Sequence, residues 1–166
     1  LLTSRGLGDV YKRQGLGKSP KVADPDIYEH KYIHCDVLVI GAGISGIMAA
    51  KMAAKNGFKT LLVDEKSYLG GSSIYDNSEF SKINNQITSS WLEKEINEIS
   101  KLENLEIKIR TSVAAFHGYN FLLARENLTD HLPINQRENK VRQRLLKIRA
   151  KNCLLYTSDA ADDFDC

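Results

Sequence analysis

Residues 35–65 read CDVLVIGAGISGIMAAKMAAKNGFKTLLVDE, and this stretch decides the fold. Cys35–Ile40 is a short apolar run, typical of a strand buried on both faces of a parallel sheet. Helix-forming residues then fill Ile44–Asn56, and Asn56-Gly57 is a typical helix end. Phe58–Val63 is a second apolar run. The order strand, glycine turn, helix, strand predicts a βαβ unit with a right-handed crossover.

The turn between the predicted strand and helix has the glycine spacing GxGxxG over residues 41–46. Gly41 permits a tight turn, Gly43 lets the backbone approach a diphosphate, and Gly46 allows the helix to pack closely on the strand. Free N–H groups and the helix dipole stabilise phosphate at such a helix N-terminus. The motif therefore predicts a dinucleotide-binding site.

Two further features follow the second strand. Asp64 lies 23 positions after Gly41, where a carboxylate binds ribose hydroxyls and repels a 2′-phosphate, so NAD or FAD is favoured over NADP. Glu65 strengthens that preference, whereas Lys66 opposes it. Gly70-Gly71 and Ser72 come next, and a double glycine at this place is typical of flavoproteins with two dinucleotide sites, where the loop returns toward the diphosphate.

The remaining pattern predicts a helix over 87–102, a strand over 105–109 and three antiparallel strands near 113–116, 119–126 and 141–150. The predicted fold class is α/β: a Rossmann-like FAD/NAD(P)-binding fold with a parallel sheet and a small antiparallel β-meander, truncated at the C-terminus.

The chain divides into four expected segments. Residues 1–14 and 153–166 resemble translated sequencing adaptors, and we expect them to be no part of the fold. Residues 15–34 contain Pro20 and Pro25 and predict a linker. Residues 35–152 form the predicted dinucleotide-binding domain, incomplete at its C-terminus.

Composition excludes several classes of protein. With 166 residues, 42% of them hydrophobic and 27% charged, the chain fits one globular domain. A net charge of +2 does not indicate nucleic-acid binding, and no apolar run reaches the ~20 residues of a membrane span. No secretory leader is visible, so we expect a cytoplasmic protein. Three scattered cysteines predict neither a disulfide framework nor a zinc site.

We predict no catalytic residue, and a structural role for His117.

Several stretches carry a resemblance to a known family: KVADPDIYEHKYIHCDVLVIG at 21–41, VLVIGAGISGIMAA at 37–50, DEKSYLGGS at 64–72, HGYN at 117–120 and IRAKN at 148–152. Together they resemble the α subunit of heterotetrameric sarcosine oxidase over about residues 15–152. The resemblance implies a module that is built like an FAD domain but holds NAD, with β, γ and δ subunits as partners. It also implies oxidative demethylation of sarcosine to glycine, hydrogen peroxide and methylenetetrahydrofolate by the whole complex, and no activity of this piece alone.

The family's NAD contacts would fall on Ser45, Asp64, Glu65, Lys66, Ser72 and Val113. With the glycine turn and the double glycine added, the candidate cofactor-binding residues are Gly41, Ala42, Gly43, Ser45, Gly46, Asp64, Glu65, Lys66, Gly71, Ser72 and Val113. Two alternatives remain open: an FAD-binding domain of another amine or opine-type dehydrogenase, and a noncatalytic Rossmann-like assembly module.

Overall fold

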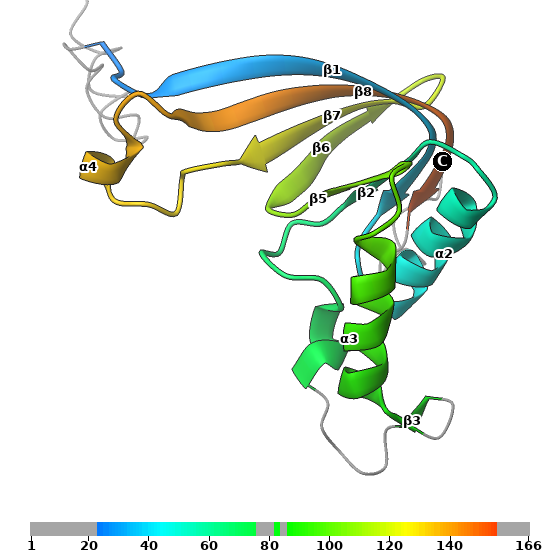
Figure 1. Cartoon of the computed structure of the whole chain (residues 1–166). Helices are drawn as coiled ribbons and strands as arrows, with labels where there is room; N and C mark the ends of the chain where they lie inside the picture. Colours follow the sequence, from blue (N-terminus) through cyan, green and yellow to red (C-terminus); the bar gives the residue numbers. More distant parts are fainter. Residues whose placement is uncertain (1–22, 76–81, 84–85, 156–166) are drawn as a thin grey trace, which may run out of the picture.

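The computed structural model describes residues 23–75, 82–83 and 86–155 (Figure 1). Its main element is a six-stranded sheet with the strand order β5-β2-β1-β8-β7-β6. These strands are β1 (Ile27–Ile40), β2 (Thr60–Val63), β5 (Leu105–Lys108), β6 (Thr111–His117), β7 (Phe121–Asn127) and β8 (Val141–Leu155). The other elements are α2 (Ile44–Lys55), a 3-10 helix at Gly71–Tyr75, β3 (Lys82–Ile83), β4 (Gln86–Ile87), α3 (Thr88–Ile99) and α4 (Ile134–Arg137).

The sheet has a parallel half and an antiparallel half, which confirms the predicted fold class. β1 pairs in parallel with β2 and β8, and β2 pairs in parallel with β5. β6, β7 and β8 form the expected antiparallel meander. β8 therefore belongs to both halves: its first part completes the meander and its last part lies beside the glycine-turn end of β1.

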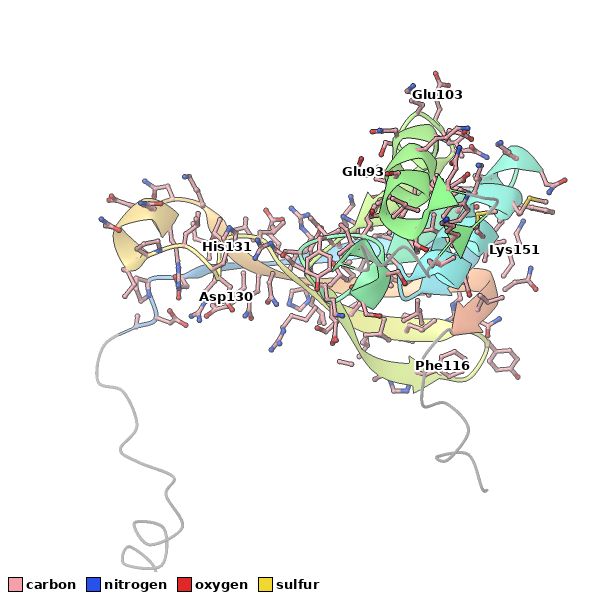
Figure 2. All side chains as sticks on the ribbon, turned by 90° about the horizontal axis from the view of Figure 1, so that it is seen from below. Glu93, Glu103, Phe116, Asp130, His131 and Lys151 are labelled. Carbon is pink, nitrogen blue, oxygen red and sulfur yellow. The ribbon has the colours of Figure 1, made fainter. Side chains whose placement is uncertain are left out.

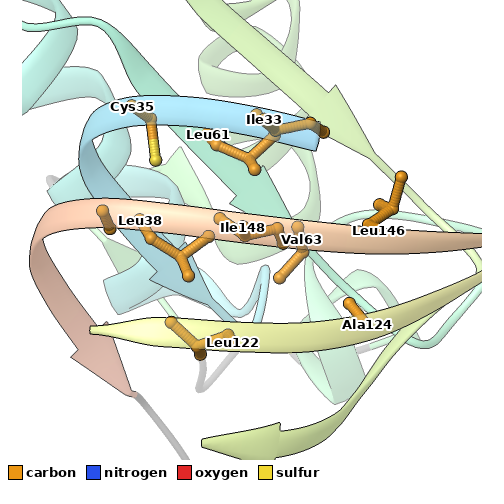
Figure 3. Packing of buried hydrophobic residues seen from close by; sticks show 10 residues of the cluster. Ile33, Cys35, Leu38, Leu61, Val63, Leu122, Ala124, Leu146 and Ile148 are labelled. Carbon is orange, nitrogen blue, oxygen red and sulfur yellow. The ribbon is translucent and has the colours of Figure 1, made fainter. Parts of the chain in front are cut away.

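The β2 strand is buried on both faces, as its continuous apolar run predicts. Leu61 and Val63 join a cluster between the parallel strands and the meander, together with Leu38, Leu122 and Ile148 (Figure 3). On the opposite face, a second cluster packs against α2 and α3; its members include Val39, Ile47, Ala50, Leu62, Trp91, Leu92 and Ile99. Each fully buried leucine or isoleucine contributes about 1.5–3 kcal/mol. Ala42 of the glycine turn belongs to the cluster against α2 and α3, which anchors the turn to the core.

The predicted linker over 15–34 is wrong in its second part, because β1 begins at Ile27. Residues 27–34 pair with β8, for example Tyr28 with Gln143 and His34 with Arg149. These two segments form an arm, defined as residues 27–34 and 141–149, that extends past the helices toward α4 (Figure 1). The partner strand lies 115 positions later, so a local pattern could not predict the pairing. Residues 15–22 lie outside the described residues.

Ion pairs hold the outer end of the arm. Arg142 lies 2.6 Å from both Asp26 and Asp130, and this guanidinium lowers the pKa of the Asp130 carboxyl. Figure 2 shows Asp130 and His131 at this outer end, far from Phe116 on the meander. The arm is thus fixed by charge as well as by strand pairing.

The expected boundary at residue 153 is not a boundary of the fold. β8 continues to Leu155, and Cys153 pairs with Leu38 and packs against the cluster between sheet and meander. Residues 1–14 and 156–166 lie outside the described residues. None of the helices in the described part of the chain has the length and apolarity that a membrane crossing requires.

Candidate dinucleotide-binding site

The glycine turn joins β1 to α2, and its three glycines have different surroundings. Gly41 has a φ of 99°, and its N–H donates to the Val63 carbonyl at 2.8 Å. A Cβ on Gly46 would lie 1.9 Å from the Gly41 oxygen, so only glycine allows α2 to approach the turn this closely. A Cβ on Gly43 would meet no atom within 4 Å. Gly43 therefore leaves one side of the turn open.

The first backbone N–H groups of α2 have no hydrogen-bond acceptor within the helix. Gly43 occupies the cap position without a side-chain hydrogen bond, and the first turn contains no acidic residue. The first helical hydrogen bond runs from the Ile47 N–H to the Gly43 carbonyl at 2.9 Å, so the earlier N–H groups have no intrahelical acceptor. These donors and the helix dipole favour an anion at Gly43–Ser45.

Asp64 lies at the end of β2, against the glycine turn. Its Oδ2 accepts a hydrogen bond from the Ala42 N–H at 2.6 Å, and its Oδ1 accepts one from the Lys66 N–H at 2.7 Å. An ionised carboxylate has about four acceptor positions, so both oxygens can also accept hydrogen bonds from a ribose. The sequence predicted the position of this acid but not its contact with Ala42.

The double glycine returns to the same turn. The Gly70 N–H donates to the Ala42 carbonyl at 2.7 Å, and a Cβ on Gly71 would lie 3.6 Å from the Gly43 Cα. Gly70 has a φ of 102° and Gly71 one of 60°, so both use backbone conformations that favour glycine. The loop after β2 is thus held over the open side of the turn.

These elements surround a cavity of about 1140 Å³. Among the candidate residues, those that line it are Gly41, Gly43, Ser45, Asp64, Glu65, Lys66, Gly71, Ser72 and Val113. The other two candidates, Ala42 and Gly46, do not line the cavity. Ala42 is fully buried and its backbone is hydrogen-bonded to Asp64 and Gly70, and Gly46 packs against Gly41. The structure therefore brings together residues that are up to 72 positions apart.

Other lining residues were not predicted. β6 contributes Thr111 and Phe116, the turn after it contributes Asn120, and Leu122 and Cys153 complete the wall. Phe116, Asn120 and Leu122 lie in the predicted meander, whereas Thr111 precedes it and Cys153 lies in the end that was expected to be no part of the fold. None of the five could be placed at the cavity, because the closure of the meander over the parallel strands is set by tertiary packing.

The described residues contain no cluster of three or more His, Cys, Asp or Glu side chains that could hold a metal ion. His117 lies exposed at the end of β6, with its ring centroid 5.9 Å from that of Phe121. Besides its apolar walls, the cavity offers backbone donors, hydroxyl groups, carboxylates and the Lys66 ammonium group, a set that suits the binding of a phosphorylated ligand.

Comparison with family models gives a match to FAD dependent oxidoreductase over residues 36–132. The chain belongs to this family. The family supports an oxidoreductase module and, of the two predicted cofactors, FAD.

Curated relatives match almost the whole chain. It is 33% identical over 144 residues to the sarcosine oxidase subunit alpha of Corynebacterium sp. (strain P-1), covering 87% of this chain and 15% of the relative. It is 34% identical over 148 residues to the corresponding subunit of Rhizobium meliloti (strain 1021), covering 89% of this chain and 15% of the relative. The chain thus spans about 15% of the length of these relatives.

Solved structures agree with the fold. The L-proline dehydrogenase from P. horikoshii superposes with a TM-score of 0.55 at 25% identity, covering 78% of this chain and 23% of that chain. A polycyclic ketone monooxygenase from Thermothelomyces thermophila has a TM-score of 0.50 at 19% identity, covering 86% and 25%, and supports the fold alone.

Proposed function

We propose that the cavity binds the adenosine diphosphate half of a dinucleotide. The observation that carries this proposal is that the glycine turn, Asp64 and the double glycine all meet at one cavity. In this arrangement the diphosphate lies on the N–H groups of Gly43–Ser45, with the Ser72 hydroxyl beside it. The ribose hydroxyls donate to Asp64.

The other candidate residues surround the adenosine. Val113, Glu65 and Lys66 all line the cavity; in this proposal the backbone of Val113 faces the adenine, and Glu65 and Lys66 lie beside the adenosine. Asp64 and Glu65 place two carboxylates where NADP would carry its 2′-phosphate. The proposal therefore excludes NADP as the preferred ligand.

FAD is the first candidate for the dinucleotide, because the matched family is FAD-dependent. NAD is the second, favoured by the match of 87% of the chain to the α subunits and by what that resemblance implies. Both ligands present the same adenosine diphosphate to the turn, so the geometry fits both. When bound, either group supplies a two-electron acceptor, while this chain's own residues bind and orient it.

We further propose that the parent enzyme oxidises a secondary amine of the sarcosine type, as the names of the α-subunit relatives suggest. In this proposal sarcosine is converted to glycine, hydrogen peroxide and methylenetetrahydrofolate by a complex with β, γ and δ subunits. This chain supplies the dinucleotide module and no catalytic residue, so the piece alone does not turn over substrate.

Calorimetric titration of the whole 166-residue chain with FAD, NAD and NADP tests the proposal. Circular dichroism first establishes that the chain is folded. We expect binding of FAD or NAD, at least tenfold weaker binding of NADP, and weaker binding by Asp64→Ala. A folded chain that binds none of the three overturns the proposal and favours the noncatalytic assembly module.

A further inference from the structure

A buried ion pair joins two strands that are not neighbours in the sheet. Lys108 on β5 lies 2.8 Å from Glu126 on β7, and each side chain is only 9% exposed. Three strands, β2, β1 and β8, separate β5 from β7 in the strand order. The sheet is therefore curved so far that the pair links its parallel half directly to the meander.

Both carboxylate oxygens of Glu126 have partners. Oε1 faces Lys108, and Oε2 accepts a hydrogen bond from Arg144 at 3.0 Å. Arg144 in turn lies 2.8 Å from Glu29, and Lys108 lies 3.3 Å from Glu106. Removal of Lys108 or Glu126 would leave the charge of its partner buried and uncompensated, which is costly.

Asp64 is connected through its backbone to Lys108 directly and to Glu126 through Thr111. The Asp64 N–H donates to the Lys108 carbonyl at 2.9 Å, and the Thr111 N–H donates to the Asp64 carbonyl at 2.7 Å. Thr111 is the direct register partner of Glu126 in the β6–β7 pair. Asp64, Lys108, Glu126 and Thr111 thus form a closed ring of contacts. Without the Lys108–Glu126 pair, β5 and β7 are linked around Asp64 only by backbone hydrogen bonds and by the chain from Lys108 to Thr111.

We propose that Lys108 and Glu126 are positioning residues for the dinucleotide. Their ion pair fixes the separation between the Asp64 carboxylate on β2 and the β6 backbone at Val113, the two walls that would grip the adenosine. This inference rests on the proposed function of the cavity. Neither side chain lines the cavity, so their effect on the ligand passes through Asp64 and Thr111.

The chain offers a matched control for a purely stabilising role. Lys51 on α2 forms a buried ion pair with Glu95 on α3, with both side chains 10% exposed. This pair is as buried as Lys108–Glu126, but it joins the two helices, and none of its residues lines the cavity. Its loss lowers stability without altering the separation of Asp64 and β6.

The test compares Glu126→Gln, Lys108→Met, their double variant and the control Lys51→Met, all in the 166-residue chain at a temperature where circular dichroism shows them folded. The ligands are the better binder of FAD and NAD, and inorganic pyrophosphate as a probe of the glycine turn alone. We expect each single variant of the ring to weaken dinucleotide binding by about fivefold, with no further loss in the double variant. In all four variants, the Kd for pyrophosphate should stay within about twofold of its value for the unaltered chain.

The control Lys51→Met should lower the melting temperature and leave the dinucleotide Kd unchanged. Unchanged dinucleotide binding by folded Glu126→Gln and Lys108→Met, with lower melting temperatures, overturns the positioning role and leaves the proposed function intact. Equal losses for pyrophosphate and dinucleotide also overturn it, because they indicate a general loss of structure. Absence of dinucleotide binding by the unaltered chain overturns the proposed function itself.

Discussion

The Oδ2 atom of Asp64 accepts a hydrogen bond from the backbone N–H of Ala42 at 2.6 Å, so the acid at the end of β2 holds the turn at the end of β1. The Oδ1 atom similarly holds the chain that leaves β2, through the Lys66 N–H. One carboxylate thus sets the shape of the site and also presents acceptors to a ribose. Its structural and ligand-binding roles should be separable by substitution.

Asp64→Asn should lower the free energy of unfolding by about 1.5–3 kcal/mol, because one of two charge-assisted hydrogen bonds from the backbone is lost. It should also weaken dinucleotide binding, since the amide donates where the carboxylate accepts. Urea unfolding and calorimetry measure the two effects. Glu65→Gln is the control for stability: Glu65 is exposed, and we expect a change within about 0.5 kcal/mol. An equal loss of stability in both variants would contradict the structural role of Asp64.

Gly46→Ala and Gly43→Ala should distinguish the role of the glycine turn in stability from its role in binding the dinucleotide. The Gly46 Cβ would overlap the Gly41 oxygen, so α2 must move and we expect a loss of more than about 2 kcal/mol of stability. Gly43→Ala adds a Cβ into open space beside the cavity, so this variant should fold normally and bind the dinucleotide less tightly. Thermal unfolding and calorimetry on both variants check this, and the reverse pattern would contradict the assigned roles.

Lys51→Met should destabilise the chain by about 3 kcal/mol, because it leaves Glu95 buried without its partner. Lys55→Met is the matched control, since Lys55 is half exposed and lies 3.7 Å from Glu98. An exposed pair of this kind contributes at most about 1 kcal/mol. Chemical unfolding measures the free energy of unfolding of both variants. Similar losses of stability in the two would contradict the prediction.

Stability should fall between pH 9 and pH 11 because of Cys35. Burial raises the pKa of this thiol from 9.0 to about 11. Over this range the unfolded chain releases the thiol proton while the folded chain keeps it, so rising pH favours unfolding. Unfolding curves at pH 8, 10 and 11 should show a smaller alkaline loss for Cys35→Ala than for the parent. Burial also raises the pKa of Cys153, so Cys153→Ala should have an effect in the same direction.

The glycine turn and the double glycine could be located from the sequence because each is fixed by local backbone geometry, and Asp64 could be located by its spacing from Gly41. Gly41 and Gly70 need positive φ values, and Gly46 needs a missing Cβ. The contact of Asp64 with Ala42 and the ring through Lys108 and Glu126 carry no such local signal. They depend on which charged side chains the curved sheet brings together.

The strands of the core were likewise predictable where both faces are buried, as in β2. The first half of β1 was not, because its side chains are mostly exposed and its hydrogen bonds come from β8. Tyr32, for example, is 66% exposed and packs beneath Lys147 of the partner strand. An exposed strand of this kind has the composition of a linker and differs from one only in its pairing.

The double membership of β8 has a consequence for the order in which the chain folds. β1 and β8 pair over nearly their whole length, yet β8 leaves the ribosome more than 100 residues after β1. Until then, β1 has β2 on one side only, and β7 has only β6. Contacts between such distant segments form slowly. Of the strands that the structure describes, β8 is synthesised last and joins the two halves, so the wall around the glycine turn closes only after β8 has paired.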